Sequence, residues 1–398
     1  MVNRRDFVST RNYLLISGLH YCLWPAYLIV NIFLVKKRQT NRILFIELGH
    51  MGDMLTTAAV MKLVKEKRKD SQIVCLCSPS AAVALNNNPF VDEIEIIDSP
   101  IWYKTKRKEG DSFLSSFKLF LKTLKSIGAS SIINVRATSY HIDHIATWLA
   151  GARERVGFGN KGLGYLLTYS GNAPSAMPLP LQKLNLVSDW LGLHNRRDTL
   201  APLFFAAEKF HPRVDLMLGE LGLAVGERII GVNPGAQHNF LWPEKYFVEL
   251  CNLIHQKYKV KLLFLGTPAH EEMIKRIQGQ IPFRTYSLAG KTNLDELFVL
   301  LGRLAMLITI DTGIRHLANA ASVPLVDMRF GADGYERYGK YVESETVIIH
   351  RVVCSPCGKE TCPLAEMVCM TGIKPQEVFN ATIAVMDAHP SLKKQSEN

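Results

Sequence analysis

The chain has 398 residues, 47% of them hydrophobic and 21% charged, which excludes a disordered polyelectrolyte and allows two domains with separate cores. The 47 lysines and arginines outnumber the 36 aspartates and glutamates, so the net charge of +11 suits a polyanionic partner. Because the basic residues are scattered and no nucleic-acid-binding motif is present, we expect anionic lipid or nucleotide phosphate as partners and no nucleic acid.

The N-terminus predicts a membrane-associating segment. Residues 12–35 contain no charged residue and lie between the basic stretches at Arg4 and Lys36. About 20 apolar residues span a bilayer as a helix, and the lack of a small-residue cleavage site argues against a secretory signal. We expect residues 1–40 to form a hydrophobic anchor, transmembrane or in-plane, with a helix docked on the globular body as the alternative. The denser basic cluster on its C-terminal side predicts a cytoplasmic body.

Short apolar strands alternate with helical stretches after the anchor. The pattern predicts strands at residues 42–48, 72–77, 93–98 and 131–136, and helices at residues 53–69 and 112–128. This alternation is typical of a parallel sheet with helices on both faces. It breaks in residues 159–182, which are rich in Gly, Pro and Ser, and residues 195–204 indicate a linker.

A second strand–helix series follows the linker. Its strands are predicted at residues 228–236, 259–266, 306–311 and 324–330. The predicted fold is therefore α/β, with two Rossmann-like doubly wound domains at residues 41–205 and 206–390 that face across a cleft, and a polar tail at residues 391–398. Ligands of such sheets bind at the carboxyl ends of the strands, so the strand ends are the places to look for a site.

The first strand of the first domain ends in a tight turn. Gly49 and Gly52 form it, and Asp53 stands where the next helix begins. Taken alone, an aspartate there is more simply a helix cap. Its position at the carboxyl end of the first strand also favours a role in catalysis, because a carboxylate there can take a proton from a bound hydroxyl.

Two strand ends of the second domain predict an anion site. In the first, Gly235 permits close approach of the backbone to a ligand. In the second, an apolar strand stops at Asp311, and Thr312 and Gly313 then begin a helix whose free amides can bind a phosphate. His316 lies one turn further along. A helix cap with a core histidine is the alternative, and we favour the anion site because several suitable groups lie within six residues.

Two other patterns are weaker. Residues 157–162 (GFGNKG) match the glycine pattern of dinucleotide-binding loops, but they open no clear helix and no acidic residue follows about 20 positions later. We interpret them as a loop, which argues against a nicotinamide-dependent oxidoreductase. Four cysteines have the spacing C-x2-C-x4-C-x6-C, which a zinc or iron–sulfur site can use, although the last two spacings are loose for a zinc ribbon. These are Cys354, Cys357, Cys362 and Cys369. We favour a thiol-rich loop and assign no metal.

An ordered set of segments resembles glycosyltransferase family 9, the heptosyltransferases of lipopolysaccharide assembly. The segments include ILFIELGHMGDMLTTAAV, NPGA with WPEKYF, LAGKTNLDELFVLL and DTGIRHLANAASVPLV, and the resemblance covers residues 42–385. It implies a GT-B fold, with an acceptor-side first domain, a donor-side second domain and no cofactor. We expect the N-terminal hydrophobic segment to attach the chain at the cytoplasmic face of the inner membrane.

The resemblance assigns roles residue by residue. Asp53 stands at the position of the family's general base, and Asp311, Thr312, Gly313 and His316 match the element that holds the donor diphosphate and sugar. This sequence departs from the family at Phe240, where a lysine usually contacts the donor phosphates. Arg315, which is not usual at its position, is expected to supply a positive charge in its place.

The leading functional hypothesis is an inverting, metal-independent glycosyltransferase. It would move a heptose-like sugar from a nucleotide-diphosphate donor, ADP-heptose or similar, to an anionic glycolipid at a membrane surface. No Asp-x-Asp element that would clamp a metal-bound diphosphate occurs in the chain. The alternative is a catalytically weakened relative that binds nucleotide-sugar or lipid as a sensor or scaffold. Phe240 favours that alternative, while Asp53 and the set from Asp311 to His316 favour the enzyme.

Overall fold

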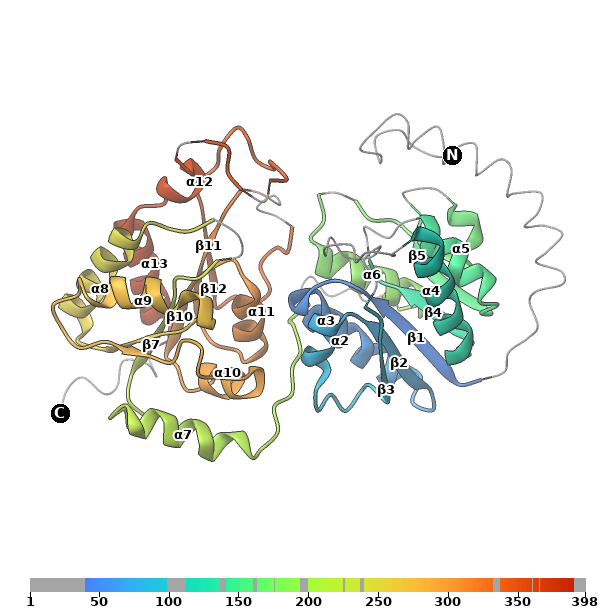
Figure 1. Ribbon diagram of the computed structural model, residues 1–398, viewed down its shortest axis with the longest axis horizontal. Coiled ribbons are helices and arrows are strands. Elements are labelled where there is room, and N and C mark those ends of the chain that lie inside the picture. The colour runs from blue at the N-terminus through green and yellow to red at the C-terminus, as the bar shows by residue number, and fades with distance from the viewer. Residues whose placement is uncertain are drawn as a thin grey trace. The chain divides into compact units, whose positions relative to one another are not determined.

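The computed structural model describes residues 40–98, 112–136, 141–159, 163–174, 176–193, 200–224, 226–236, 240–331, 337–359, 361–364 and 366–389. The chain divides between Leu200 and Ala201 into two compact units, called unit 1 and unit 2 below (Figure 1). The expected hydrophobic anchor at residues 12–35 and the polar tail lie outside the described residues. Within the described ranges no helix is long and apolar enough to cross a membrane.

Unit 1 contains one six-stranded parallel sheet. Its strands are β1 (Arg42–Glu47), β2 (Gln72–Cys77), β3 (Glu93–Ile96), β4 (Ser131–Asn134), β5 (Glu154–Phe158) and β6 (Tyr169–Gly171). They lie in the order β3-β2-β1-β4-β5-β6. In the centre, Phe45 of β1 pairs in register with Cys75 of β2 and Ile133 of β4. These side chains are buried because helices cover both faces of the sheet, which explains the continuous apolar strand sequences.

The helices of unit 1 lie on the two faces of this sheet (Figure 1). They are α2 (Met51–Lys67), α3 (Pro79–Ala82), α4 (Phe113–Ile127), α5 (His141–Leu149) and α6 (Leu179–Trp190), with short 3-10 turns at Val83–Leu85 and Gly164–Leu166. α4 packs with α5 over the side chains of Leu44 and Ile46, whereas α2 packs with α6. α4 begins after Ser112, whose hydroxyl accepts from the Ser115 amide, and ends at Gly128 in the left-handed conformation.

The predicted break at residues 159–182 is wrong. β5 precedes it, and β6 and the start of α6 lie inside it, so the sheet continues through this region. The apolar pattern is hidden because β5 contains Arg155, whose buried guanidinium donates to the carbonyls of Leu166 and Ala152 at 2.6 and 2.7 Å. Gly157 and Phe158, interpreted as loop residues, belong to β5.

Unit 2 repeats the same architecture. Its strands are β7 (Ile229–Asn233), β8 (Lys261–Phe264), β9 (Tyr286–Ser287), β10 (Met306–Ile310), β11 (Leu325–Arg329) and β12 (Glu345–Ile349). All paired strands are parallel, in the order β12-β11-β10-β7-β8-β9. β9 and β12 were not predicted, because β9 has only two residues and β12 is only partly buried.

Helices also cover both faces of the second sheet. They are α7 (Phe210–Glu220), α8 (Glu244–Tyr258), α9 (Glu271–Gln278), α10 (Leu294–Leu301), α11 (Gly313–Ala320), α12 (Val368–Thr371) and α13 (Pro375–Ala388), with a 3-10 turn at Pro268–His270. Trp242, just before α8, is buried and donates its indole N–H to the carbonyl of Ile373 at 2.9 Å. The prediction of two Rossmann-like α/β domains is therefore confirmed.

The strand orders locate the places where ligands bind. In unit 1 the chain starts at β1 and returns to its other side with β4; in unit 2 it does the same with β7 and β10. In doubly wound sheets, ligands bind beyond the carboxyl ends of the strands at this reversal point. The turns after β1 and β4, and those after β7 and β10, are the corresponding positions here.

Candidate active site

Asp53 lies in the first turn of α2, directly beyond β1. Its carboxylate Oδ2 accepts a hydrogen bond from the backbone N–H of His50 at 3.2 Å, so the expected capping role is present. A Cβ at Gly49 would lie 2.5 Å from that oxygen. Glycine is therefore required for the carboxylate to fold back over the turn. The side chain is only partly buried, at the reversal point of the sheet, so capping does not remove it from the candidate site.

A buried lysine, which the sequence did not reveal as a site residue, anchors this turn. Lys183 on α6 directs its ammonium group to the Glu47 carboxylate Oε2 and to the backbone carbonyl of Asp53, both at 2.8 Å. It also donates to the hydroxyls of Thr57 and Thr56 at 2.9 and 3.2 Å. The Lys183 and Glu47 side chains are 4% and 2% exposed. A single cation thus joins β1, the turn, α2 and α6.

Glu47 completes this cluster from the strand side. Its Oε1 accepts from the backbone N–H of Gly49 at 3.0 Å, and its Oε2 accepts from the Thr57 hydroxyl at 2.9 Å. The carboxylate therefore fixes the first residue of the turn, while Lys183 fixes the carbonyl of Asp53. The only sequence signal was a lysine inside the otherwise apolar or uncharged stretch LPLQKLNLV of residues 179–187.

A second cation lies just beyond β4, the strand next to β1. Arg136 is partly buried, and its backbone N–H donates to the side chain of Asn134 at 3.1 Å. Its Nη1 is buried and has no hydrogen-bond partner among the residues that the structure describes. An unsatisfied guanidinium nitrogen at the carboxyl edge of the sheet is suited to an anionic ligand group.

The two predicted strand ends of unit 2 come together through Asn233, the last residue of β7. Its amide Nδ2 donates to the hydroxyls of Thr309 and Thr312 at 3.0 and 3.4 Å, and to the carbonyl of Gly235 at 3.1 Å. Thr312 also donates to the carbonyl of Ile310 at 3.2 Å. The turns after β7 and β10 therefore form one polar edge at the reversal point of the second sheet.

A histidine that follows the neighbouring strand β8 lies against Gly235. His270 follows β8, and a Cβ at Gly235 would overlap its imidazole ring, so the turn requires glycine. Nδ1 of the ring accepts from the backbone N–H of Thr267 at 3.2 Å. Burial lowers the pKa of His270, so the ring is more readily neutral at pH 7.

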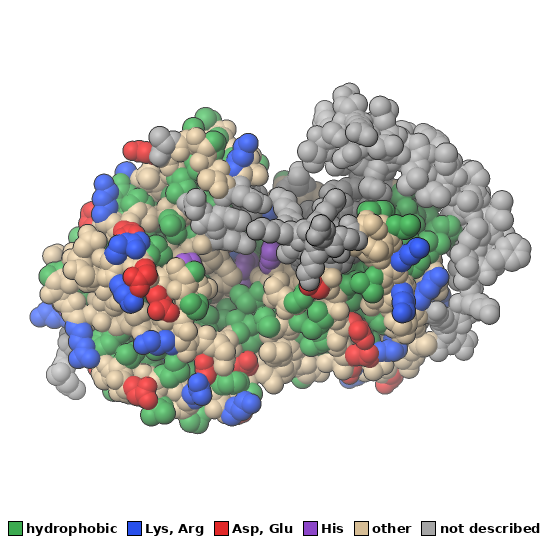
Figure 2. All heavy atoms as spheres, viewed as in Figure 1, with side chains coloured by type: hydrophobic (Ala, Val, Ile, Leu, Met, Phe, Trp, Pro, Cys, Tyr) green, Lys and Arg blue, Asp and Glu red, His purple; other side chains and the backbone are tan. Residues whose placement is uncertain are grey.

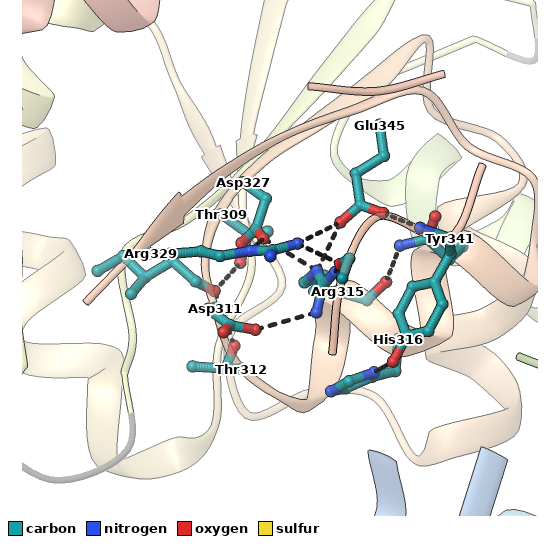
Figure 3. Close-up of polar contacts among 12 residues, drawn as sticks. Thr309, Asp311, Thr312, Arg315, His316, Asp327, Arg329, Tyr341 and Glu345 are labelled. Carbon is teal, nitrogen blue, oxygen red and sulfur yellow. Dashed lines mark hydrogen bonds and ion pairs between the residues drawn. The ribbon is translucent and has the colours of Figure 1, made fainter. Parts of the chain in front are cut away.

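Arg315 is placed differently from the expectation that it contacts the donor (Figure 3). Its side chain is fully buried, and its Nε lies 2.6 Å from Glu345 Oε1 and 2.9 Å from Asp327 Oδ2. Its other nitrogens lie 3.3 Å from Asp311 Oδ1 and 2.6 Å from the Gly339 carbonyl. Burial alone would lower the pKa of this guanidinium, but the adjacent carboxylates hold it above its usual value. Arg315 therefore acts within the protein.

The rest of this buried network holds the loop before β12. Arg329 pairs with Asp327 at 2.8 Å and donates to the Gly339 carbonyl at 2.6 Å. The Tyr341 backbone N–H donates to Glu345 Oε2 at 2.8 Å. Asp327, Arg329 and Glu345 are each at most 3% exposed, so the network is shielded from water (Figure 3).

Protonation of Asp327 provides a testable pH dependence. Burial raises the pKa of Asp327 to about 7, against about 3.9 in an unfolded chain. The stability contributed by this group is thus complete below about pH 4 and is lost as the pH rises towards 7. We expect Asp327→Asn to remove this decline of stability with rising pH in urea unfolding. An unchanged slope, equal to that of the exposed control Asp70→Asn, would contradict this assignment.

His316 points into the same loop rather than along the helix axis. Its Nδ1 is hydrogen-bonded to the Tyr341 hydroxyl at 2.7 Å (Figure 3). Its ring also meets the Tyr338 ring edge-on, with centroids 4.8 Å apart. The Asp311 side chain is 22% exposed. Gly313 is the first residue of α11, with Thr312 before it as the N-cap. Asp311, Thr312 and Gly313 therefore remain together at the helix start.

Phe240 is buried against another aromatic ring. It is 2% exposed and stacks on Phe330, with ring centroids 4.7 Å apart. The side chain at the position of the family's usual lysine thus belongs to the core of unit 2.

The four C-terminal cysteines lie near one another and differ in exposure. Across the described part of the chain, no group of three or more His, Cys, Asp or Glu residues could hold a metal ion. Cys369 is buried and Cys354 is exposed. Burial raises the pKa of Cys369, and the neighbouring thiols add to this effect.

Comparison with known structures places the fold. A family 9 glycosyltransferase from Veillonella parvula superposes with a TM-score of 0.71 at 19% identity, over 87% of this chain and 97% of that chain. The E. coli heptosyltransferase WaaC, solved with ADP-2-deoxy-2-fluoro heptose, superposes with a TM-score of 0.62 at 16% identity, over 86% and 99% of the two chains. The two Rossmann-like units of this chain thus have a GT-B-like fold, as these neighbours do.

Sequence comparison narrows this class. Residues 181–368 match the family model described as glycosyltransferase family 9 (heptosyltransferase). Lipooligosaccharide heptosyltransferase 2 of Campylobacter jejuni is 26% identical over 160 residues, 39% of this chain and 50% of that protein. This part of the chain is therefore similar to glycosyltransferase family 9. It spans about half the length of the first curated relatives that it matches.

Proposed function

We propose that this chain is an inverting, metal-independent glycosyltransferase that moves a heptose-like sugar from a nucleoside-diphosphate donor to lipopolysaccharide or another lipid-linked glycan. The observation that carries the proposal is that each sheet has suitable groups at its reversal point. In unit 1 these include the Asp53 carboxylate, and in unit 2 the polar edge from Asn233 to Thr312. The names of the relatives, which include a lipooligosaccharide heptosyltransferase, support this choice of substrates.

In the proposed reaction, Asp53 accepts the proton of an acceptor hydroxyl while the oxygen of that hydroxyl attacks the anomeric carbon of the donor sugar. The bond from that carbon to the diphosphate breaks at the same time, and the electron pair leaves with the nucleoside diphosphate. The Thr312 hydroxyl, which turns its proton from the Ile310 carbonyl to the ligand, and the free amides at the start of α11 stabilise the leaving group's charge. Attack opposite the leaving group inverts the anomeric centre.

The remaining charged groups support roles in the same scheme. Arg136, at the carboxyl edge of the first sheet, suits an anionic group of the acceptor. The chain lacks an Asp-x-Asp element, so helix amides and hydroxyls take the place of a metal clamp in the proposal. Residues 12–35, uncharged between basic flanks, support attachment of the body to the cytoplasmic face of the inner membrane.

Donor binding is the first test of this function. We expect calorimetric titration of the full chain in detergent to show binding of ADP and ADP-heptose in preference to UDP and GDP. Thr312→Val should weaken ADP binding by about 10- to 100-fold, because it removes a hydrogen bond to a charged group. The control Thr371→Val, in α12, should leave binding unchanged.

The outcomes separate the hypotheses. Binding of one nucleotide with transfer of its sugar to a lipid-linked acceptor supports the enzyme. Donor binding without transfer to any such acceptor favours the sensor or scaffold. No binding to any of the four ligands overturns the proposed site.

A further inference from the structure

α4 presents a basic and apolar face to solvent. Its buried side is formed by Phe120, Leu124 and Ile127, which pack in unit 1. At its N-terminal end, however, Phe113 and Leu114 are 56% and 58% exposed. Leu119, in its middle, is 48% exposed. Large side chains with so much exposure on adjacent turns indicate a surface that contacts something apolar.

Lysines share one side of α4, its outer face, with Leu114, whereas Phe113 and Leu119 project from other sides of the helix. Leu114, Lys118, Lys122 and Lys125 recur at intervals of four, four and three residues, so they lie along one side of the helix, opposite Phe120 and Leu124. All three lysines are exposed, and α4 contains no acidic residue. In Figure 2 the surface over α4 shows Lys or Arg side chains beside hydrophobic ones.

The topology relates this face to the candidate base. α4 follows β3 and precedes β4, which are parallel to β1. A crossover helix between parallel strands starts at their carboxyl ends and runs back towards the amino ends. Phe113 and Leu114 are therefore at the same edge of the sheet as Asp53, and the lysines follow along the helix.

We propose that the outer face of α4 docks on an anionic membrane surface. Leu114 enters the headgroup region, and Lys118 and Lys122 contact lipid phosphates, as basic helices with apolar residues do. Docking of this face lays α4 along the bilayer that holds a lipid-linked acceptor, with its start at the carboxyl edge of the first sheet. The proposal rests on the proposed function only for that acceptor; the docking itself is independent of catalysis.

Lysine footprinting on the full chain tests the docking. The chain is acetylated briefly with or without vesicles, and the modified lysines are quantified by mass spectrometry. We expect vesicles of equal parts phosphatidylcholine and phosphatidylglycerol to protect Lys118, Lys122 and Lys125, but not the exposed control residues Lys67 and Lys69. Vesicles of phosphatidylcholine alone should protect none of them. The residue-level readout stays informative even if the N-terminal segment attaches the chain to both kinds of vesicle.

Two variants sharpen the test, with Lys125 as the reporter. Lys118→Gln with Lys122→Gln should weaken docking about thirtyfold, at about 1 kcal/mol for each lysine near an anionic surface, and Lys125 should lose its protection. The charge-matched control Lys67→Gln with Lys69→Gln should keep it. Equal protection by neutral vesicles, or none by either kind, overturns the proposal. Protection that instead grows with protein concentration without vesicles assigns the face to a second copy of the chain and also overturns it.

Discussion

Replacing Asp53 by asparagine is expected to lower kcat by about 10²- to 10⁴-fold, the usual contribution of a general base. The Asp53 carboxylate accepts a hydrogen bond from the His50 N–H at 3.2 Å, and the amide oxygen of asparagine can accept the same bond. The helix start therefore stays capped, and only the ability to take a proton is lost. Steady-state kinetics with an ADP-sugar and a lipid-linked acceptor measure the effect, and calorimetry of ADP binding should show no change.

The matched comparison is Asp70→Asn, an exposed aspartate after α2, which should leave kcat unchanged. If Asp53→Asn turns over at the wild-type rate, Asp53 is a cap alone and the base lies elsewhere. If Asp53→Asn lowers activity only by unfolding the chain, its urea midpoint will fall together with kcat.

Replacing Lys183 by methionine is expected to destabilise the protein by about 3–5 kcal/mol, because it leaves a buried carboxylate without its cation. The Glu47 side chain is 2% exposed and has its ion-pair partner at 2.8 Å, so water cannot replace the ammonium group. Urea unfolding monitored by circular dichroism measures this loss.

Two further variants test whether the loss in Lys183→Met comes from the uncompensated charge of Glu47. Adding Glu47→Gln to Lys183→Met removes the uncompensated charge and should recover most of the stability. Lys62→Met, which removes a half-exposed lysine paired with Glu66 at 3.9 Å, should cost less than 1 kcal/mol, as surface pairs do. A loss in Lys183→Met no larger than that of Lys62→Met would contradict a structural role for the pair.

The sequence was most informative where local chemistry decides structure. Continuous apolar runs predict buried parallel strands, and a strand that stops at Asp311, Thr312 and Gly313 predicts a helix start that can bind an anion. These signals lie within a few residues of one another. The structure brings the ends of β7 and β10 together because the reversal of strand order places these two strands side by side. The turn with Gly49 and Asp53 was predictable for the same reason.

Side chains whose role depends on distant partners were not predictable. Arg315 is adjacent in sequence to candidate donor-binding residues, yet its partners Asp327 and Glu345 come from β11 and β12 and draw it into the interior. Arg155 similarly concealed β5, because its buried hydrogen bonds come from residues outside the strand. A charged residue is predicted from the sequence to be exposed to solvent, unless a partner far away in the sequence is known.

The Lys183–Glu47 pair also imposes an order on protein synthesis. The partners are separated by 136 residues, so the Asp53 turn leaves the ribosome long before α6 exists to supply its cation. Until then Glu47 has no buried partner, and burying it alone is unfavourable. The turn that carries Asp53 is thus completed late, by a contact of high sequence separation, which is the kind that slows folding. A nascent chain released before residue 183 can contain the strand and helix around Asp53 but not the arrangement that fixes them.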